Sequence, residues 1–135
     1  MANGLYNKGR EGFMIGGINM SANDIRCILV DLADYTVNLA THDYLDDVPA
    51  AARVAVSTAM TSKTVTDGIF DAADITWTAV SGDPSEAVII YQHTGTESTS
   101  RLIAYIDTAT GLPVIPNGGN ITVTFDNGTN RIFKL

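Results

Sequence analysis

The chain has few of the residue types on which several protein classes depend. It contains one cysteine, and only 17% of its 135 residues are charged. A single cysteine forms neither an internal disulfide nor a cysteine-rich zinc site, so a disulfide-stapled secreted scaffold is excluded. The hydrophobic content of 45% is too high for intrinsic disorder. A chain of this length builds one hydrophobic core, so we expect a single domain over residues 1–135.

Basic residues are also scarce, and they are scattered. Eight Lys and Arg stand against 15 Asp and Glu, for a net charge of −7. Nucleic-acid binding needs a basic patch, and no Lys/Arg cluster occurs, so we expect no binding to DNA, RNA or an anionic membrane. No apolar run approaches the roughly 20 residues that span a bilayer. The first ten residues lack the pattern of a secretory signal, which predicts synthesis and retention in a cytoplasm.

The low charge is accompanied by abundant Thr, Ser, Ala and Asn. A free monomer usually has about a quarter or more charged residues. An uncharged polar surface packs readily against other protein, because few charges must lose their water. This composition favours a subunit of an assembly, and the alternative is a monomer with a Thr-rich sheet surface.

The N-terminal segment, residues 1–20, predicts a short helix packed on the rest of the domain. Leu5, Gly9, Phe13 and Gly16 recur at helical spacing. The glycine side of such a helix allows close approach to another backbone. The Gly16-Gly17 pair is expected to end the helix, since Gly adopts the left-handed conformation that closes helices.

The remainder predicts short antiparallel strands. Ile25–Val30 and Ala87–Tyr91 are apolar and rich in β-branched residues, which is typical of buried strands. Ile75–Val80 alternates, which places Ile75, Trp77 and Ala79 on one face. Further expected elements are a helical turn at 41–45, strands at 53–60, 64–66 and 101–106, a turn at Asp67-Gly68, and a C-terminal hairpin of 121–125 with 131–135 around Asn127-Gly128. Together they predict a mainly β fold, an antiparallel β-sandwich or jelly-roll-like domain with a short N-terminal helix.

Nucleophilic catalysis needs Ser or Cys beside a His and an orienting acid. Cys27 lies inside an apolar strand, where a free thiol is usually inert. His42 precedes Asp43 at an expected helix start, and His93 follows a strand. Neither histidine belongs to a nucleophile or metal motif, so we predict that the protein is not an enzyme.

Two groups of carboxylates remain as candidates for chemistry. Asp43, Asp46 and Asp47 cluster within five residues, and Asp71 with Asp74 forms a second pair. Glycosidases need two carboxyls facing each other across a cleft, which neighbours in one loop do not provide. Acidic loops suit Ca²⁺, but no calcium-loop motif is present. A solvated acidic turn is favoured, and we expect no catalytic residue, metal or cofactor.

Several segments resemble small virion structural proteins of tailed bacteriophages, and the likeness runs nearly end to end as an overall pattern without a catalytic signature. These segments are Asn3–Arg10 with Phe13 and Gly16–Ile18, Ile25–Asp31, Ala40–Pro49, Arg101–Asp107 and Gly118–Gly128.

This resemblance implies a capsid cement or decoration protein, a β-rich module on the capsid exterior that binds the outside of the assembled shell and stabilises it. Its partners would be the major capsid protein and further copies of itself. The alternative is a tail, neck or host-attachment module with glycan- or protein-binding loops at His93–Ser100 and Thr108–Gly119. For the contact surface the sequence suggests Leu5, Tyr6, Tyr44, Asp46 and Asp47, although for Leu5 and Phe13 core packing of a helix against the sheet is favoured over direct contact.

Overall fold

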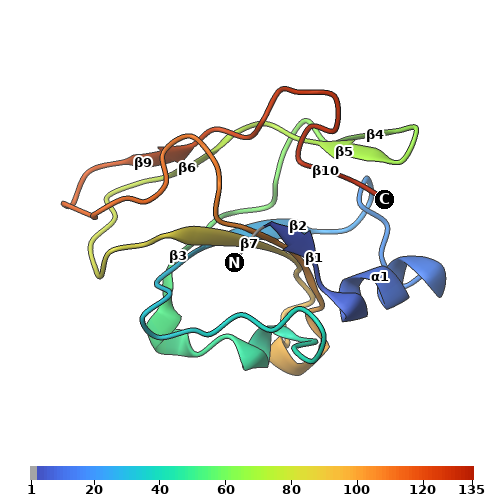
Figure 1. The fold of residues 1–135 in the computed structure, drawn as a ribbon, viewed down its shortest axis with the longest axis horizontal. Helices are drawn as coiled ribbons and strands as arrows, with labels where there is room; N and C mark the ends of the chain where they lie inside the picture. The colour runs from blue at the N-terminus through green and yellow to red at the C-terminus, as the bar shows by residue number, and fades with distance from the viewer. Residues whose placement is uncertain (1–2) are drawn as a thin grey trace.

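The computed structural model describes residues 3–135, and its elements are short strands joined by long loops, with one α-helix near the N-terminus (Figure 1). The prediction of a mainly β fold with a short N-terminal helix is confirmed. In chain order the elements are β1 (Gly4–Leu5), α1 (Asn7–Met14), β2 (Ile25–Val30), η1 (Leu45–Asp47), η2 (Ala50–Ala52), β3 (Arg53–Val56), β4 (Thr64–Thr66), β5 (Ile69–Asp71), β6 (Ile75–Trp77), β7 (Ala87–Gln92), η3 (Glu97–Thr99), β8 (Leu102–Ile106), β9 (Ile121–Val123) and β10 (Phe133–Lys134).

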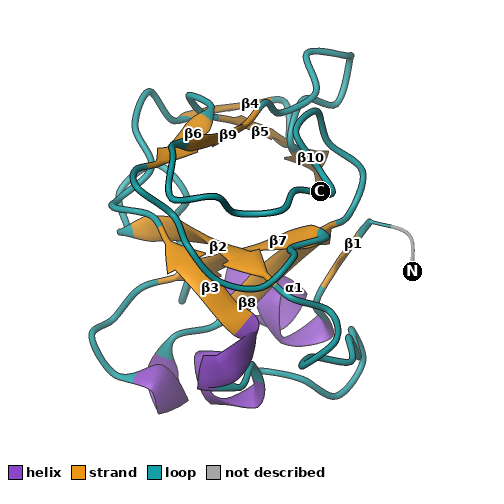
Figure 2. Ribbon diagram, turned by 90° about the vertical axis from the view of Figure 1, so that its left-hand side faces the viewer, coloured by secondary structure: helices purple, strands orange, loops and turns teal. Residues whose placement is uncertain are grey.

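The strands form two facing layers in a sandwich-like arrangement that does not close into a barrel (Figure 2). One layer is a five-stranded sheet in the order β1-β8-β7-β2-β3. The other consists of a three-stranded sheet, β10-β5-β4, and a two-stranded sheet, β6-β9. Every strand pair is antiparallel, as expected from turns at short intervals.

The five-stranded sheet is buried on both faces. Cys27 and Leu29 of β2 lie in the cluster between the two layers. Ile28 and Val30 lie on the opposite face, in a second cluster that the 35–52 segment covers. β7 alternates in the same way between the two clusters. Burial on both faces explains why these strands are continuously apolar in sequence.

Helix α1 packs its glycine side against β8, as its spacing predicts. A Cβ added at Gly9 would lie 2.8 Å from the carbonyl oxygen of Leu102 and 3.0 Å from Cα of Ile103. The helix begins later than expected, at Asn7, because Leu5 is paired with Ala104 in the sheet. It ends just before Gly16, whose φ of +74° is the left-handed conformation that the Gly-Gly pair predicts.

The expected C-terminal hairpin is wrong. β9 pairs with β6, in the register Ile75↔Val123, and β10 pairs with β5. The type I′ turn that Asn-Gly usually forms in a hairpin needs positive φ at both central residues, yet neither Asn127 nor Gly128 is among the residues of 3–135 with positive φ. Its N–H instead bonds Oδ1 of Asp126, so the segment turns locally and carries the chain from one sheet to another.

The Asp67-Gly68 turn, in contrast, is confirmed. Both residues have positive φ, +53° and +78°, so they form the two-residue turn that joins β4 to β5. Thr66 pairs with Ile69 directly beside the turn. The hairpin carries β4 to the edge of its sheet, where all three of its residues are exposed.

Three smaller expectations need correction. β6 ends at Trp77, and Ala79 is exposed at a φ of +50°, so Val80 occupies the buried position instead. The helical turn begins at Leu45 and not at Thr41, because Tyr44 bridges to Arg101 in extended conformation. The strand after it stops at Val56, because the ladder becomes irregular: the N–H groups of Ser57 and Met60, three residues apart, bond the carbonyls of Cys27 and Ile25, only two residues apart in β2.

Candidate protein-binding surfaces

Two of the residues suggested as contacts are core residues. The Tyr6 side chain is fully buried, and Leu5 is 9% exposed. Leu5 belongs to the cluster between the layers, and Tyr6 belongs to the cluster on the other face of the five-stranded sheet. As a surface contact Tyr6 is wrong, and for Leu5 the favoured core packing is confirmed, because packing of β1 against β8 removes both side chains from solvent.

The other three suggested contacts stay near the surface in the η1 turn. Asp46 is exposed, and Tyr44 and Asp47 are half-buried. The guanidinium of Arg101 lies 5.6 Å from the centre of the Tyr44 ring, in a cation–π contact. Oδ2 of Asp47 accepts a 2.7 Å hydrogen bond from the backbone N–H of Asp43. Asp47 therefore shapes the turn, whereas Asp46 is free to contact a partner.

The coupling between Asp43 and Asp47 also changes their acidity. Partial burial and the neighbouring Asp47 raise the pKa of Asp43. Burial alone would raise the pKa of Asp47 as well, but the hydrogen bonds from Asp43 and the charge of His42 lower it.

In residues 3–135, two groups of carboxylates have oxygens within 4.8 Å of one another. One is the predicted cluster of Asp43, Asp46 and Asp47, and the other joins Asp31 and Asp34 to Asp83. Glu86 lies beside the second group, and its pKa is raised by burial and by the charge of Asp31. Either group could coordinate a hard cation through oxygen.

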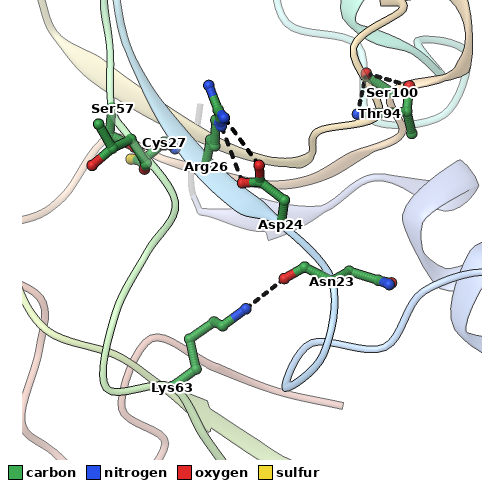
Figure 3. A network of polar contacts seen from close by, with 9 residues as sticks. Asn23, Asp24, Arg26, Cys27, Ser57, Lys63, Thr94 and Ser100 are labelled. Carbon is green, nitrogen blue, oxygen red and sulfur yellow. Dashed lines mark hydrogen bonds and ion pairs between the residues drawn. The ribbon is translucent and has the colours of Figure 1, made fainter.

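The residues considered for nucleophilic chemistry have structural contacts. Cys27 is fully buried, burial raises the pKa of its thiol, and its backbone N–H bonds Oγ of Ser57. Figure 3 shows this part of β2, with the Arg26–Asp24 ion pair and the Lys63 side chain on the backbone oxygen of Asn23. The polar contacts drawn there tie loops to β2 and to one another.

His42 ends a chain of hydrogen bonds that enters the core. The hydroxyl oxygens of Tyr6 and Tyr35 are 3.0 Å apart, and the Tyr35 hydroxyl lies 2.8 Å from Nδ1 of His42. The Tyr35 and His42 rings also lie against each other, with centroids 5.3 Å apart. His93 packs on the edge of Tyr91, and its Nδ1 is buried without a hydrogen-bond partner in the described chain.

An apolar surface that the sequence analysis did not find occupies one end of the molecule. Met14, Ile15, Val65 and Leu135 are between 53% and 87% exposed. Val65 and Leu135 line a hollow of about 360 Å³ together with residues of α1, the following loop, β5 and β10. Met14 and Ile15 lie in the chain between two lining residues of this hollow, Phe13 and Gly16. We call these four side chains and the hollow the apolar end. In Figure 1 the loop that follows α1 extends towards the β4–β5 hairpin and the C-terminus on this side of the molecule.

A sequence signal for the apolar end exists. Met14 and Ile15 follow Phe13 directly, so at helical spacing they fall outside the stripe of Leu5, Gly9 and Phe13. Apolar side chains outside the packed stripe of a helix are candidates for contacts with another molecule. Of the six most exposed large apolar side chains in residues 3–135, only Val56 and Ile115 lie elsewhere.

Two further hollows adjoin along the side of the sandwich where β1 and β10 lie. The larger, about 550 Å³, is lined by Thr108, Thr110 and Thr124 and by Asp126 and Arg131. The smaller, about 220 Å³, lies between β1, β8 and β10. Both hollows share Asn3, Ile106 and Ile132 in their walls.

Trp77, which the alternating pattern assigns to the core, is 4% exposed. It therefore offers no aromatic platform for a sugar. Within residues 3–135, no helix has the length and apolar character needed to cross a bilayer.

The chain was compared with protein-family models and with curated proteins. No protein-family model matches the chain, and no curated protein matches it.

Proposed function

We propose that the protein is a structural subunit of a tailed-phage particle, of the capsid cement type, that binds the outside of the assembled shell and acts without catalysis. The observation that carries the proposal is the apolar end, where Met14 is 87% exposed and Ile15 is 64% exposed. Exposed apolar patches beside a hollow mark protein-binding surfaces. The resemblance of the chain to small virion proteins names the partner class, the major capsid protein together with neighbouring copies of this chain.

In this role the protein stabilises the assembled shell by mass action. A subunit that binds only the assembled shell shifts the equilibrium away from dissociated capsid subunits. Each contact is repeated by the symmetry of the shell, so many weak contacts add. The low charge of the chain reduces the number of ions that must be desolvated at the contact.

The test is occupancy on particles encoded by the same genome, measured by cryo-electron microscopy and mass spectrometry. We expect the wild-type chain on the capsid exterior and at least tenfold lower occupancy for Met14→Ser/Ile15→Ser. Burying one such side chain contributes about 1.5–3 kcal/mol, and about 1.4 kcal/mol is a factor of ten in affinity.

Ile115→Ser is the matched control, because Ile115 is 76% exposed but lies in the 108–119 loop, which contributes no residue to the hollow of the apolar end. It should leave occupancy unchanged. The proposal fails if the chain is absent from particles or occurs only on the tail. It also fails if the Ile115 variant loses as much occupancy as the Met14/Ile15 variant.

A tail, neck or host-attachment role is the second candidate, and one observation favours it. The predicted binding loop at 108–119 contributes Thr108 and Thr110 to the 550 Å³ hollow, opposite Asp126 and Arg131. Hydroxyl, carboxylate and guanidinium groups in one hollow suit a polar ligand such as a glycan. Saturable binding on a glycan array that Thr110→Val abolishes, with no binding to capsids, would favour this role over the cement role.

A further inference from the structure

The side of the sandwich that carries β1 and β10 has two unpaired strand edges. β1 is the outer strand of the five-stranded sheet and bonds only β8, and β10 is the outer strand of its own sheet and bonds only β5. Figure 2 shows the two strands in opposite layers on the same side of the molecule. The 220 Å³ cleft lies between them. Unpaired strand edges are templates for an extended chain.

The cleft has an apolar floor and a basic rim. Leu5, Ala104, Ile132 and Phe133 contribute to its walls, and Arg10 and Lys134 are its charged residues. Arg10 comes from the first half of α1, and Lys134 comes from β10. The fold therefore brings together two cations from opposite ends of the chain.

These two cations differ from the other six Lys and Arg residues. Lys8, Arg26 and Arg53 each pair with a carboxylate. Lys63, Arg101 and Arg131 each donate to an oxygen of another residue. Within residues 3–135, only Arg10 and Lys134 have neither an ion pair nor a side-chain hydrogen bond. In a chain with 15 acidic residues, the two unpartnered cations line the same cleft.

We infer that this cleft binds an extended, acidic segment of a partner protein. A carboxylate of the segment would lie between Arg10 and Lys134, and an adjacent apolar side chain would occupy the floor. Charge-assisted hydrogen bonds to Arg and Lys are the strong ones, and Arg can bind a carboxylate in bidentate fashion. The adjoining 550 Å³ hollow gives the segment room to continue past Asn3 and Ile132.

The net charge of −7 does not oppose this partner. Charges separated by more than about 8 Å are largely screened at physiological salt, so the two cations at the cleft outweigh distant carboxylates. A nucleic acid is disfavoured, because specific complexes neutralise about 6–10 phosphates and the cleft offers two cations. The inference does not depend on the proposed capsid role: Phe133 contributes to both hollows, but Arg10 and Lys134 line only the cleft and not the hollow of the apolar end.

The test measures fluorescence anisotropy of a labelled, end-blocked peptide of alternating Leu and Glu with the full chain, at low and high salt. The matched peptide has Gln in place of every Glu. We expect saturable binding of the Glu peptide that weakens with salt, and at least tenfold weaker binding of the Gln peptide. Arg10→Gln/Lys134→Gln should weaken binding of the Glu peptide at least tenfold.

Lys8→Gln is the control, because it removes the same charge from the same helix outside the cleft. It should change affinity less than twofold. No saturable binding, equal binding of both peptides, or an equal loss in the Lys8 variant overturns the inference. So does binding of a labelled DNA duplex through Arg10 and Lys134 without peptide binding. The comparison of the two peptides uses wild-type protein, so the test stands even if a variant misfolds.

Discussion

The hydroxyl of Tyr6 lies 3.0 Å from the hydroxyl of Tyr35, and both side chains are buried. The contact ties the residue after β1 to a loop 29 residues later in the chain. Tyr35 in turn lies 2.8 Å from Nδ1 of His42, so Tyr35 is the middle member of the chain of hydrogen bonds. The Tyr35 hydroxyl therefore has two hydrogen-bond partners, Tyr6 and His42, whereas the Tyr6 hydroxyl bonds Tyr35.

We predict that Tyr35→Phe destabilises the fold more than Tyr6→Phe. Removing the Tyr35 hydroxyl leaves the buried Tyr6 hydroxyl unpaired, which costs about 1–3 kcal/mol, whereas Tyr6→Phe removes one hydrogen bond worth about 0.5–1.5 kcal/mol. The double variant should lose less than the sum of the single variants. Urea unfolding gives the free energies, and equal losses for the two single variants would contradict the prediction.

The buried tyrosines also predict unfolding at alkaline pH. Burial raises the pKa of Tyr6 and of Tyr35 above the ordinary value of 10.0, and it raises the pKa of Tyr105 to about 12. Above pH 10 the unfolded chain loses these protons first, so the stability present below pH 10 is lost as the pH rises towards 12. Urea midpoints should fall across this window, together with the appearance of tyrosinate absorbance. An unchanged midpoint at pH 11.5 would show that the prediction is wrong.

Gly9→Ala should destabilise the packing of α1 on β8. The added Cβ would lie 2.8 Å from the backbone oxygen of Leu102, and overpacking of this kind costs about 1–3 kcal/mol. Gly17→Ala is the control, because a Cβ there meets its nearest neighbour at 3.5 Å, an ordinary contact. Thermal unfolding of both variants measures the difference, and a Gly9 variant as stable as the Gly17 variant would refute the close approach.

Charge reversal should affect the free energy of unfolding differently at Asp46 and Asp47, the two neighbouring acids of the η1 turn. Asp46→Lys should change the free energy of unfolding by no more than about 0.5 kcal/mol, as is usual at exposed positions. Asp47→Lys removes the acceptor of the Asp43 N–H and should cost about 1–2 kcal/mol. Chemical unfolding distinguishes the two variants. Only the Asp46 variant is therefore a clean probe of capsid contact at this turn, and a reversed order of stability would contradict the assignment.

Cys27 should not react with a thiol reagent in the folded protein. It is fully buried, and burial raises the pKa of its thiol, so the reactive thiolate is suppressed. The reaction rate should rise with urea in parallel with global unfolding. Rapid modification of the native protein would show that β2 opens locally.

Two turns of similar composition show where the sequence was sufficient to predict a hairpin and where it was not. Asp67-Gly68 joins two short strands that pair with each other, and both residues have positive φ. Asn127-Gly128 has the same turn chemistry, but the strands on either side pair with β6 and β5. In the second case β9 pairs with β6, a strand distant in the sequence, and not with β10. Ile75 and Thr76 of β6 form the matching edge, and the Thr76 and Thr122 hydroxyls lie 2.8 Å apart.

The candidate surfaces show the same division. Tyr6 was suggested as a contact residue because it is a tyrosine in or near an expected loop and interfaces are rich in tyrosine, but packing against the five-stranded sheet buries it completely. The exposure of Met14 and Ile15 has a signal in the sequence, but the hollow beside them and the cleft do not, because their walls come from α1, the β4–β5 hairpin and the C-terminus. No local sequence pattern predicts that α1, the β4–β5 hairpin and the C-terminus lie side by side.

The sequence by itself determined the β class, the central strands, the glycine face of α1 and the burial of Cys27 and Trp77. These follow from hydrophobic periodicity and from the size of glycine, which act over a few residues. The tertiary structure alone decided which strands pair, which tyrosines are buried and which cations remain without a partner. These outcomes depend on contacts between distant segments, which the packing of the whole chain selects.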